Sequence, residues 1–206
     1  MLVGDSIFDN GAYVPGKPCV GDQLASALAG GGGKATLLAS DGAVVAGVAV
    51  QLGRLPPDAT HLVVSVGGND ALHHAGILDR KIENSAQLFG ELAAIHAEFR
   101  SAYARMLDAV LAHGKPTAVC TIYDSNFESP KKELADVALS VFDDAILRCA
   151  SERGVAVIDL RRIFRDRKDY ANSIEPSDIG GEKMVQAILG VVRSHDFTGR
   201  QTVLYP

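Results

Sequence analysis

A serine near the start of the chain has the surroundings that a nucleophile needs. Ser6 lies in residues 4–10 (GDSIFDN), directly after a short apolar stretch. Its small and polar neighbours allow a reacting group to approach the hydroxyl closely. The alternative role is a turn serine that caps the following helix. This segment alone does not separate the two roles.

Two further segments offer hydrogen-bond donors in similar positions. Residues 67–70 (GGND) follow the apolar run 61–66 (HLVVSV), which places the side-chain amide of Asn69 just beyond a strand. Gly42 follows the apolar run 35–39, and it has no side chain to shield its backbone N–H. Because sites in parallel sheets collect at the carboxyl ends of the strands, we expect Ser6, Gly42 and Asn69 to lie at one edge.

The elements that must position these residues alternate between strands and helices. Short apolar runs bounded by Gly, Pro and polar residues predict buried strands at residues 35–39, 61–66, 117–122 and 155–160, with a short one before Gly4. Apolar positions spaced three and four apart predict helices over residues 88–110, 134–149 and 184–192. This alternation predicts an α/β fold in which helices cover both faces of a parallel sheet.

A single domain is expected to span residues 1–206, since the length suits one domain and no linker, repeat or shift in composition divides the chain. The run 30–34 (GGGGK) lacks the spacing of a phosphate-binding loop and precedes a strand, so it is interpreted as a turn. Residues 199–206 are expected to form a surface tail.

The composition argues against several classes of partner. A net charge of −5, with 25 acidic and 20 basic residues, gives no basic surface for nucleic acid. No apolar stretch approaches the roughly 18 residues that a membrane span needs.

The adjacent His73 and His74 diverge on a helix or a strand, so no metal site is expected. Three cysteines without C-x-x-C spacing indicate reduced thiols in a cytoplasmic protein.

Four short motifs, in order along the chain, resemble those of the SGNH hydrolases, also called the GDSL esterase/lipase family. They are GDSIFDN around Ser6, SDGA around Gly42, GGND around Asn69, and IEPSDIGG at residues 174–181. The resemblance spans nearly the whole chain and implies a flavodoxin-like three-layer α/β/α sandwich. It implies a serine-dependent hydrolase of small-molecule carboxylic esters that needs no cofactor. Ser6 would be the nucleophile, and the N–H groups of Ser6 and Gly42 with the Asn69 amide would form the oxyanion hole.

The fourth motif departs from the family pattern. Where the family has Asp-x-x-His before Pro-Ser, this chain has Asn172 and Glu175. Our first hypothesis is that burial raises the pKa of Glu175 enough for it to act as the base, with Asn172 as an orienting residue that donates to it. In a second hypothesis His73 or His74 supplies the base. In a third the site is inactive, and Glu175 is only a carboxylate at the start of the helix that Ser177 caps.

Three functions are compatible with these residues. The leading one is ester hydrolysis. The second is a protein of the same fold that binds an acylated or glycosylated ligand in a site without a base, and the third is a flavodoxin-like binder of nucleotides or phosphate. The acyl and alcohol parts of the substrate and the oligomeric state are not determined by these patterns. Only three residues precede Gly4, so a longer native N-terminus also stays open.

Overall fold

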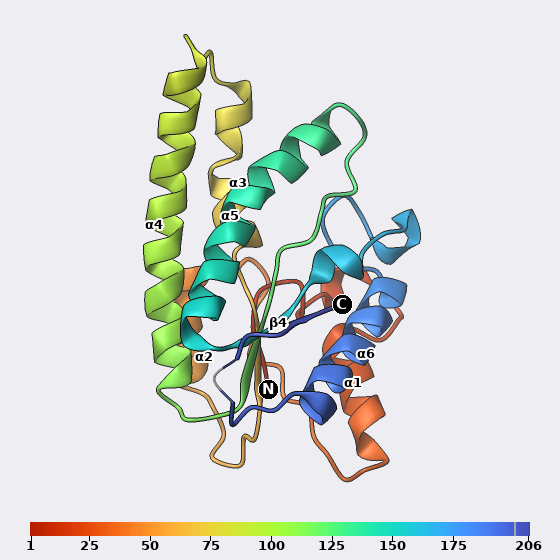
Figure 1. The fold of residues 1–206 in the computed structure, drawn as a ribbon. Coiled ribbons are helices and arrows are strands. Elements are labelled where there is room, and N and C mark those ends of the chain that lie inside the picture. The colour runs from red at the N-terminus through yellow and green to blue at the C-terminus, as the bar shows by residue number, and fades with distance from the viewer. Residues whose placement is uncertain (200) are drawn as a thin grey trace.

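A parallel sheet forms the centre of the molecule. The computed structural model describes residues 1–199 and 201–206. Its strands pair in chain order: β1 (Leu2–Gly4), β2 (Leu62–Ser65), β3 (Thr117–Cys120), β4 (Ala156–Ile158) and β5 (Leu204–Tyr205). Figure 1 shows the fold, coloured from red at the N-terminus to blue at the C-terminus. On the outer side of β1, Leu37 forms a parallel bridge to Leu2. With that segment, the sheet has the strand order of a flavodoxin-like fold, in which the second extended segment lies outside the first.

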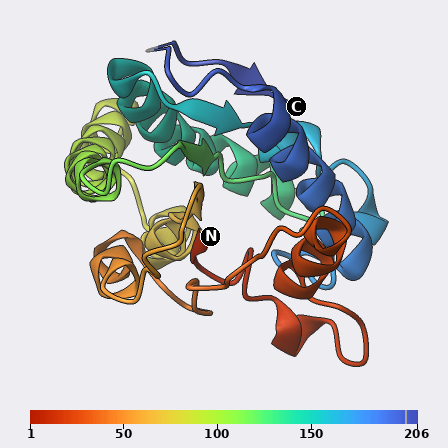
Figure 2. The same cartoon turned by 90° about the horizontal axis from the view of Figure 1, so that it is seen from below.

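Helices cover both faces of this sheet, as Figure 2 shows from below. One layer consists of α1 (Val20–Ala29) and α6 (Asp178–Ser194), and the opposite layer of α2 (Val48–Leu52), α4 (Ser85–Leu111) and α5 (Lys131–Arg153). A short helix, α3 (Gly68–His73), directly follows β2. The expected three-layer α/β/α sandwich is confirmed.

The strand sequences explain why the sheet is buried on both faces. Along β2, Leu62 and Val64 pack against α2, α4 and α5, whereas Val63 packs toward α1 and α6. All three side chains are almost fully buried. An apolar run without polar alternation is therefore what this central position requires.

Local sequence signals fix the ends of the long helices. The side chain of Asn84 accepts the N–H of Gln87 at the start of α4, and that of Ser177 accepts the N–H of Gly180 at the start of α6. Helix α5 ends at Gly154, which has the left-handed conformation that favours glycine. Within the described part of the chain, no helix combines the length and apolar character that crossing a membrane would need.

Two expectations about extended segments were wrong. Residues 35–39 form the bridge to β1 but no regular strand. The expected surface tail at residues 199–206, of which residue 200 lies outside the described residues, ends in a strand: Leu204–Tyr205 is β5, and the N–H of Asp159 donates to the carbonyl of Tyr205 at 2.8 Å. A strand of two residues is too short to produce a periodic pattern in the sequence.

Candidate active site

Ser6 lies in a tight turn just beyond β1, at the carboxyl edge of the sheet. The N–H groups of Phe8 and Asp9 both donate to the carbonyl of Asp5, which folds the chain around the serine. Ser6 Oγ donates a hydrogen bond to Glu175 Oε1 at 3.1 Å. Both side chains are buried, with 5% and 7% of their surface exposed. The turn therefore brings the expected nucleophile into direct contact with the expected base.

The end of β1 is held in place by Gln51 of α2. The N–H of Gly4 donates to Gln51 Oε1 at 2.8 Å, and Gln51 Nε2 donates to the carbonyl of Gly4 at 2.7 Å. Gly4 has a φ of +136°, and a Cβ atom there would lie 1.7 Å from the carbonyl oxygen of Ser65. Only glycine fits this position, so the backbone two residues before Ser6 has little freedom.

The surroundings of Glu175 make it a stronger base than an ordinary carboxylate. Burial raises the pKa of Glu175 to about 7, and the negative charge of Asp41 adds to the rise, while the hydrogen bond from Ser6 opposes it. Glu175 Oε2 is buried and has no hydrogen-bond partner among the described residues. A carboxyl group with this pKa changes its charge near neutral pH, the range in which a general base works best.

Asn172 forms its hydrogen bonds with the backbone of this loop. We expected its side chain to donate to the Glu175 carboxylate instead. Its Oδ1 accepts the N–H groups of Ile174 at 2.8 Å and of Glu175 at 2.9 Å. The side chain turns back onto its own segment, as short Asn side chains do in turns. Asn172 thus orients Glu175 through the main chain.

Asn10, a residue that the sequence analysis did not single out, connects two segments of the site. Asn10 is fully buried; its Nδ2 donates to the carbonyl of Pro176, and its Oδ1 accepts the N–H of Val20. It therefore ties the loop that carries Glu175 to the start of α1. The signal was available, because Asn10 closes the same GDSIFDN segment that contains Ser6.

Two of the expected oxyanion-hole residues, Gly42 and Asn69, lie on segments that are hydrogen bonded to each other. Asn69 Nδ2 donates to the carbonyl of Ala43 at 2.9 Å, which leaves the second hydrogen of the amide for another acceptor. Gly42, the residue before Ala43, is exposed and has a φ of +74°. Among the described residues, the backbone N–H groups of Ser6 and Gly42 have no acceptor. Each of these three residues therefore has an N–H hydrogen without an acceptor among the described residues.

Neither His73 nor His74 takes the place of Glu175 as the hydrogen-bond partner of Ser6. His73 is exposed at the end of α3, and His74 packs on Phe142 with a distance of 6.1 Å between ring centroids. Within the described chain, neither histidine is hydrogen bonded to Ser6, whose side-chain partner is Glu175. The arrangement favours Glu175 as the base.

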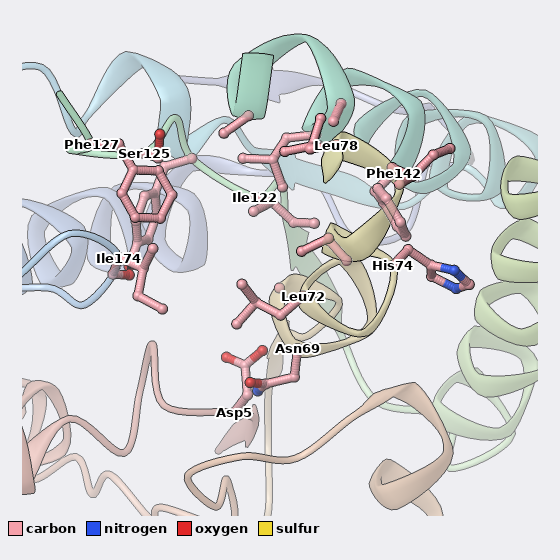
Figure 3. A pocket seen from close by; sticks show the side chains of 18 of the residues that line it. Asp5, Asn69, Leu72, His74, Leu78, Ile122, Ser125, Phe127, Phe142 and Ile174 are labelled. Atoms are coloured by element: carbon pink, nitrogen blue, oxygen red, sulfur yellow. The ribbon is translucent and has the colours of Figure 1, made fainter. Parts of the chain in front are cut away.

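A cavity of about 180 Å³ opens beside these residues (Figure 3). Asp5, Ser6, Asn69 and Glu175 line its polar end, and apolar side chains line most of the remainder. The site therefore combines a small set of converging polar groups with an apolar wall, which is typical of a pocket for a small molecule.

Asp5 is a second carboxyl group in this cavity. It is 2% exposed, and its Oδ1 accepts the N–H of Ile7 at 3.2 Å. Burial raises the pKa of Asp5 to about 8, and the charges of Glu175 and Asp70 also contribute to the rise. Burial therefore disfavours the ionised form of Asp5, and an ionised Glu175 disfavours it further.

We expect Asp5→Asn to retain activity at neutral pH and to change the alkaline side of the pH profile. An ionised Asp5 would repel negative charge that develops beside Ser6, so kcat/KM of the natural protein should fall above about pH 8. Asparagine keeps the acceptor for Ile7 and cannot ionise, so the variant should lack this fall. The measurement is kcat/KM for a chromogenic ester between pH 6 and pH 10.

The same substitution should alter the pH dependence of stability. Because folding raises the pKa of Asp5 from 3.8 to about 8, its contribution to the free energy of unfolding is complete below pH 3.8 and is lost as the pH rises to about 8. Asp5→Asn should remove that loss, whereas Asp58→Asn, at an exposed position, should not. Loss of most activity at every pH in Asp5→Asn would show that the carboxyl group itself is required.

Comparisons with known proteins bear on the family and the fold of this chain. The model of the GDSL-like Lipase/Acylhydrolase family matches residues 2–180. A comparison with curated proteins gave no match.

Among solved structures, the fold is similar to that of an extracellular lipase from Streptomyces rimosus, with a TM-score of 0.68, 17% identity and coverage of 95% of this chain and 98% of the lipase. It is also similar to Axe2-W215I, an acetyl xylan esterase from Geobacillus stearothermophilus, with a TM-score of 0.66, 13% identity and coverage of 98% and 94%. Phospholipase A1 from Streptomyces albidoflavus NA297 matches with a TM-score of 0.61, 18% identity and coverage of 95% and 98%. At these identities the structural likeness shows a shared fold.

Proposed function

Since the chain belongs to the GDSL-like lipase/acylhydrolase family of ester hydrolases, we propose that it cleaves carboxylic esters with Ser6 as nucleophile and Glu175 as general base. The observation that carries this proposal is the hydrogen bond from Ser6 Oγ to Glu175 Oε1. It gives the hydroxyl proton a direct path to a carboxylate whose pKa, at about 7, suits the transfer.

The first half of the reaction transfers the acyl group to the enzyme. Ser6 Oγ attacks the carbonyl carbon of the ester while its proton passes to Glu175 Oε1. The carbonyl oxygen becomes an oxyanion, and the N–H groups of Ser6 and Gly42 and the Asn69 amide stabilise it. When the intermediate collapses, the bond to the alcohol oxygen breaks, and Glu175 returns the proton to the leaving alcohol. The product is an acyl-Ser6 ester.

The second half repeats these steps with water. Glu175 takes a proton from a water molecule, whose oxygen attacks the acyl carbon, and then gives the proton to Ser6 Oγ as the acid leaves. One carboxylate thus serves as base and acid in both halves. In the family pattern, a histidine fills this role, and an aspartate is needed as a third residue to fix the orientation of the imidazole. A carboxylate has no N–H to orient, which fits the contact of Asn172 with the backbone.

A fluorophosphonate probe tests the proposal directly. We expect it to label the natural protein at one serine, Ser6, in a one-to-one ratio, because an activated hydroxyl is needed for rapid attack on phosphorus. Ser40→Ala, at an exposed serine near Gly42, should label normally, and Ser6→Ala should not label. Absence of labelling in the natural protein would support instead a ligand-binding protein without a working base.

A further inference from the structure

The apolar part of the cavity has the form of a slot between helices. The walls come from α3 and the short 3₁₀ turn Ala75–Asp79 on one side, and from α4, α5 and the loop before α5 on the others. The α5 residues that line it extend from Lys131 to Phe142. At 1.5 Å per residue, the stretch of α5 that lines the slot is about 16 Å long.

The side chains along the slot offer apolar contact and space. Ala135 and Ala138 of α5 are small, and Leu72 and Leu78 also line the slot. At one end Phe142 packs edge-on against Phe99, with ring centroids 4.9 Å apart, so the hydrophobic core closes the slot there. Figure 3 shows Phe142 and His74 at this end, and Phe127, Ser125 and Ile174 at the other.

Polar contacts of Ser125 at one end of the slot hold its wall in shape. The N–H and Oγ of Ser125 both donate to Asp136 Oδ1, at 3.0 and 3.1 Å. Lys132 Nζ donates to the carbonyl of Ser125 at 2.9 Å. These bonds fix the loop before α5 onto the first turns of that helix, so a ligand would enter a slot that is already formed.

We propose that this slot binds the acyl chain of the ester, and that the preferred substrates carry a straight, medium-length acyl group such as octanoyl. The inference rests on the proposed function and adds the class of substrate. A long and mainly apolar slot that leads away from Ser6 gains free energy with each methylene group it buries. An acetyl group would leave most of it empty.

The position of Glu175 determines which part of the ester enters the slot. The leaving alcohol must receive its proton from Glu175, so it lies on the side of that carboxylate. Asp41 is close enough to Glu175 to raise the pKa of its carboxyl group, and Tyr13 donates to Asp41 Oδ2 at 2.9 Å. Neither residue lines the slot. The alcohol therefore faces a polar, solvent-exposed surface, and the acyl chain extends along the apolar walls.

A series of p-nitrophenyl esters tests this inference. From acetate through butyrate to octanoate, we expect kcat/KM to rise about three-fold for each added methylene group, as burial in an apolar pocket provides. Ala138→Phe should fill the slot, lowering kcat/KM for octanoate at least about ten-fold and leaving that for acetate within about two-fold. Val137→Phe, on the exposed side of the same helix, is the matched control and should match the natural protein for every ester. Ala135→Leu is a milder substitution in the slot that keeps the test available when Ala138→Phe does not fold.

A binding measurement separates this inference from the proposed function. With Ser6→Ala, which cannot turn over, methyl octanoate should bind at least about ten-fold more tightly than methyl acetate, and Ala138→Phe in the same background should remove the difference. Equal kcat/KM for acetate and octanoate, or equal binding of the two methyl esters, would overturn the acyl slot and leave ester hydrolysis by Ser6 intact. Tighter binding of methyl octanoate, with no hydrolysis of any ester and no fluorophosphonate labelling, would support the slot and overturn the proposed function.

Discussion

Ser6→Ala is expected to lower kcat for ester hydrolysis by about 10⁴-fold or more, because it removes the atom that forms the acyl-enzyme. The N–H donors and the cavity stay in place in this variant, so KM for any residual reaction should change little. The measurement is steady-state hydrolysis of p-nitrophenyl octanoate, with residual activity followed at high enzyme concentration.

Stability provides the control for this variant. The substitution removes one hydrogen bond, to Glu175, which typically contributes about 0.5–1.5 kcal/mol. The Tm should therefore stay within a few degrees of that of the natural protein. Retention of most of the activity would exclude Ser6 as the nucleophile.

Glu175→Gln is expected to lower kcat/KM by about 10²- to 10⁴-fold, the range that general acid–base catalysis usually contributes. Glutamine keeps the size of the side chain and an acceptor for Ser6 but cannot take its proton. In the natural protein, activity should rise as the pH increases through about 7, since Glu175 must lose its proton to act as a base. This rise should be absent from the residual activity of the variant. The measurement is kcat/KM from pH 5 to pH 9.

Two further variants make the result specific to this carboxyl group. Glu182→Gln, the same chemical change at an exposed position of α6, should leave the profile unchanged. Asn172→Asp combined with Glu175→His rebuilds the pattern of the family, and it should hydrolyse esters faster than Glu175→Gln. Full activity in Glu175→Gln would leave this carboxylate with a structural role and return His73 and His74 to consideration as the base.

The fold could be predicted where burial leaves a clear pattern. The runs 61–66 and 117–122 are mainly apolar, and they contain β2 and β3, whose two faces are both covered. The three long helices carry apolar residues on one face, and α4, α5 and α6 contain all the positions that the spacing indicated. Strand β5 has only two residues, and its position depends on pairing with β4, a contact that is distant in sequence.

The candidate site could be predicted where the motif is local. Ser6 and Asn69 follow their strands directly, so the strand ends determine where they lie. The partnership of Ser6 with Glu175 spans 169 residues and was expected only through the resemblance to a family. Burial of Asp5 and the slot along α5 arise from the packing of several elements together, and no short stretch of sequence encodes them.

Strand β5 affects how readily copies of this protein associate through the edge of the sheet. It occupies the outer side of β4, where the carbonyls of Tyr205 and of Val203, just before the strand, accept the N–H groups of Asp159 and Val157. The ring of His195, directly after α6, contacts Tyr205 and holds the strand in place, with 3.0 Å between Nδ1 and the phenol oxygen. A chain shortened before Leu204 would present β4 as a bare, apolar edge, and such edges recruit strands from other molecules. By covering the edge of β4, strand β5 lowers the tendency of the protein to aggregate. A fusion partner should therefore be attached where it does not disturb this strand.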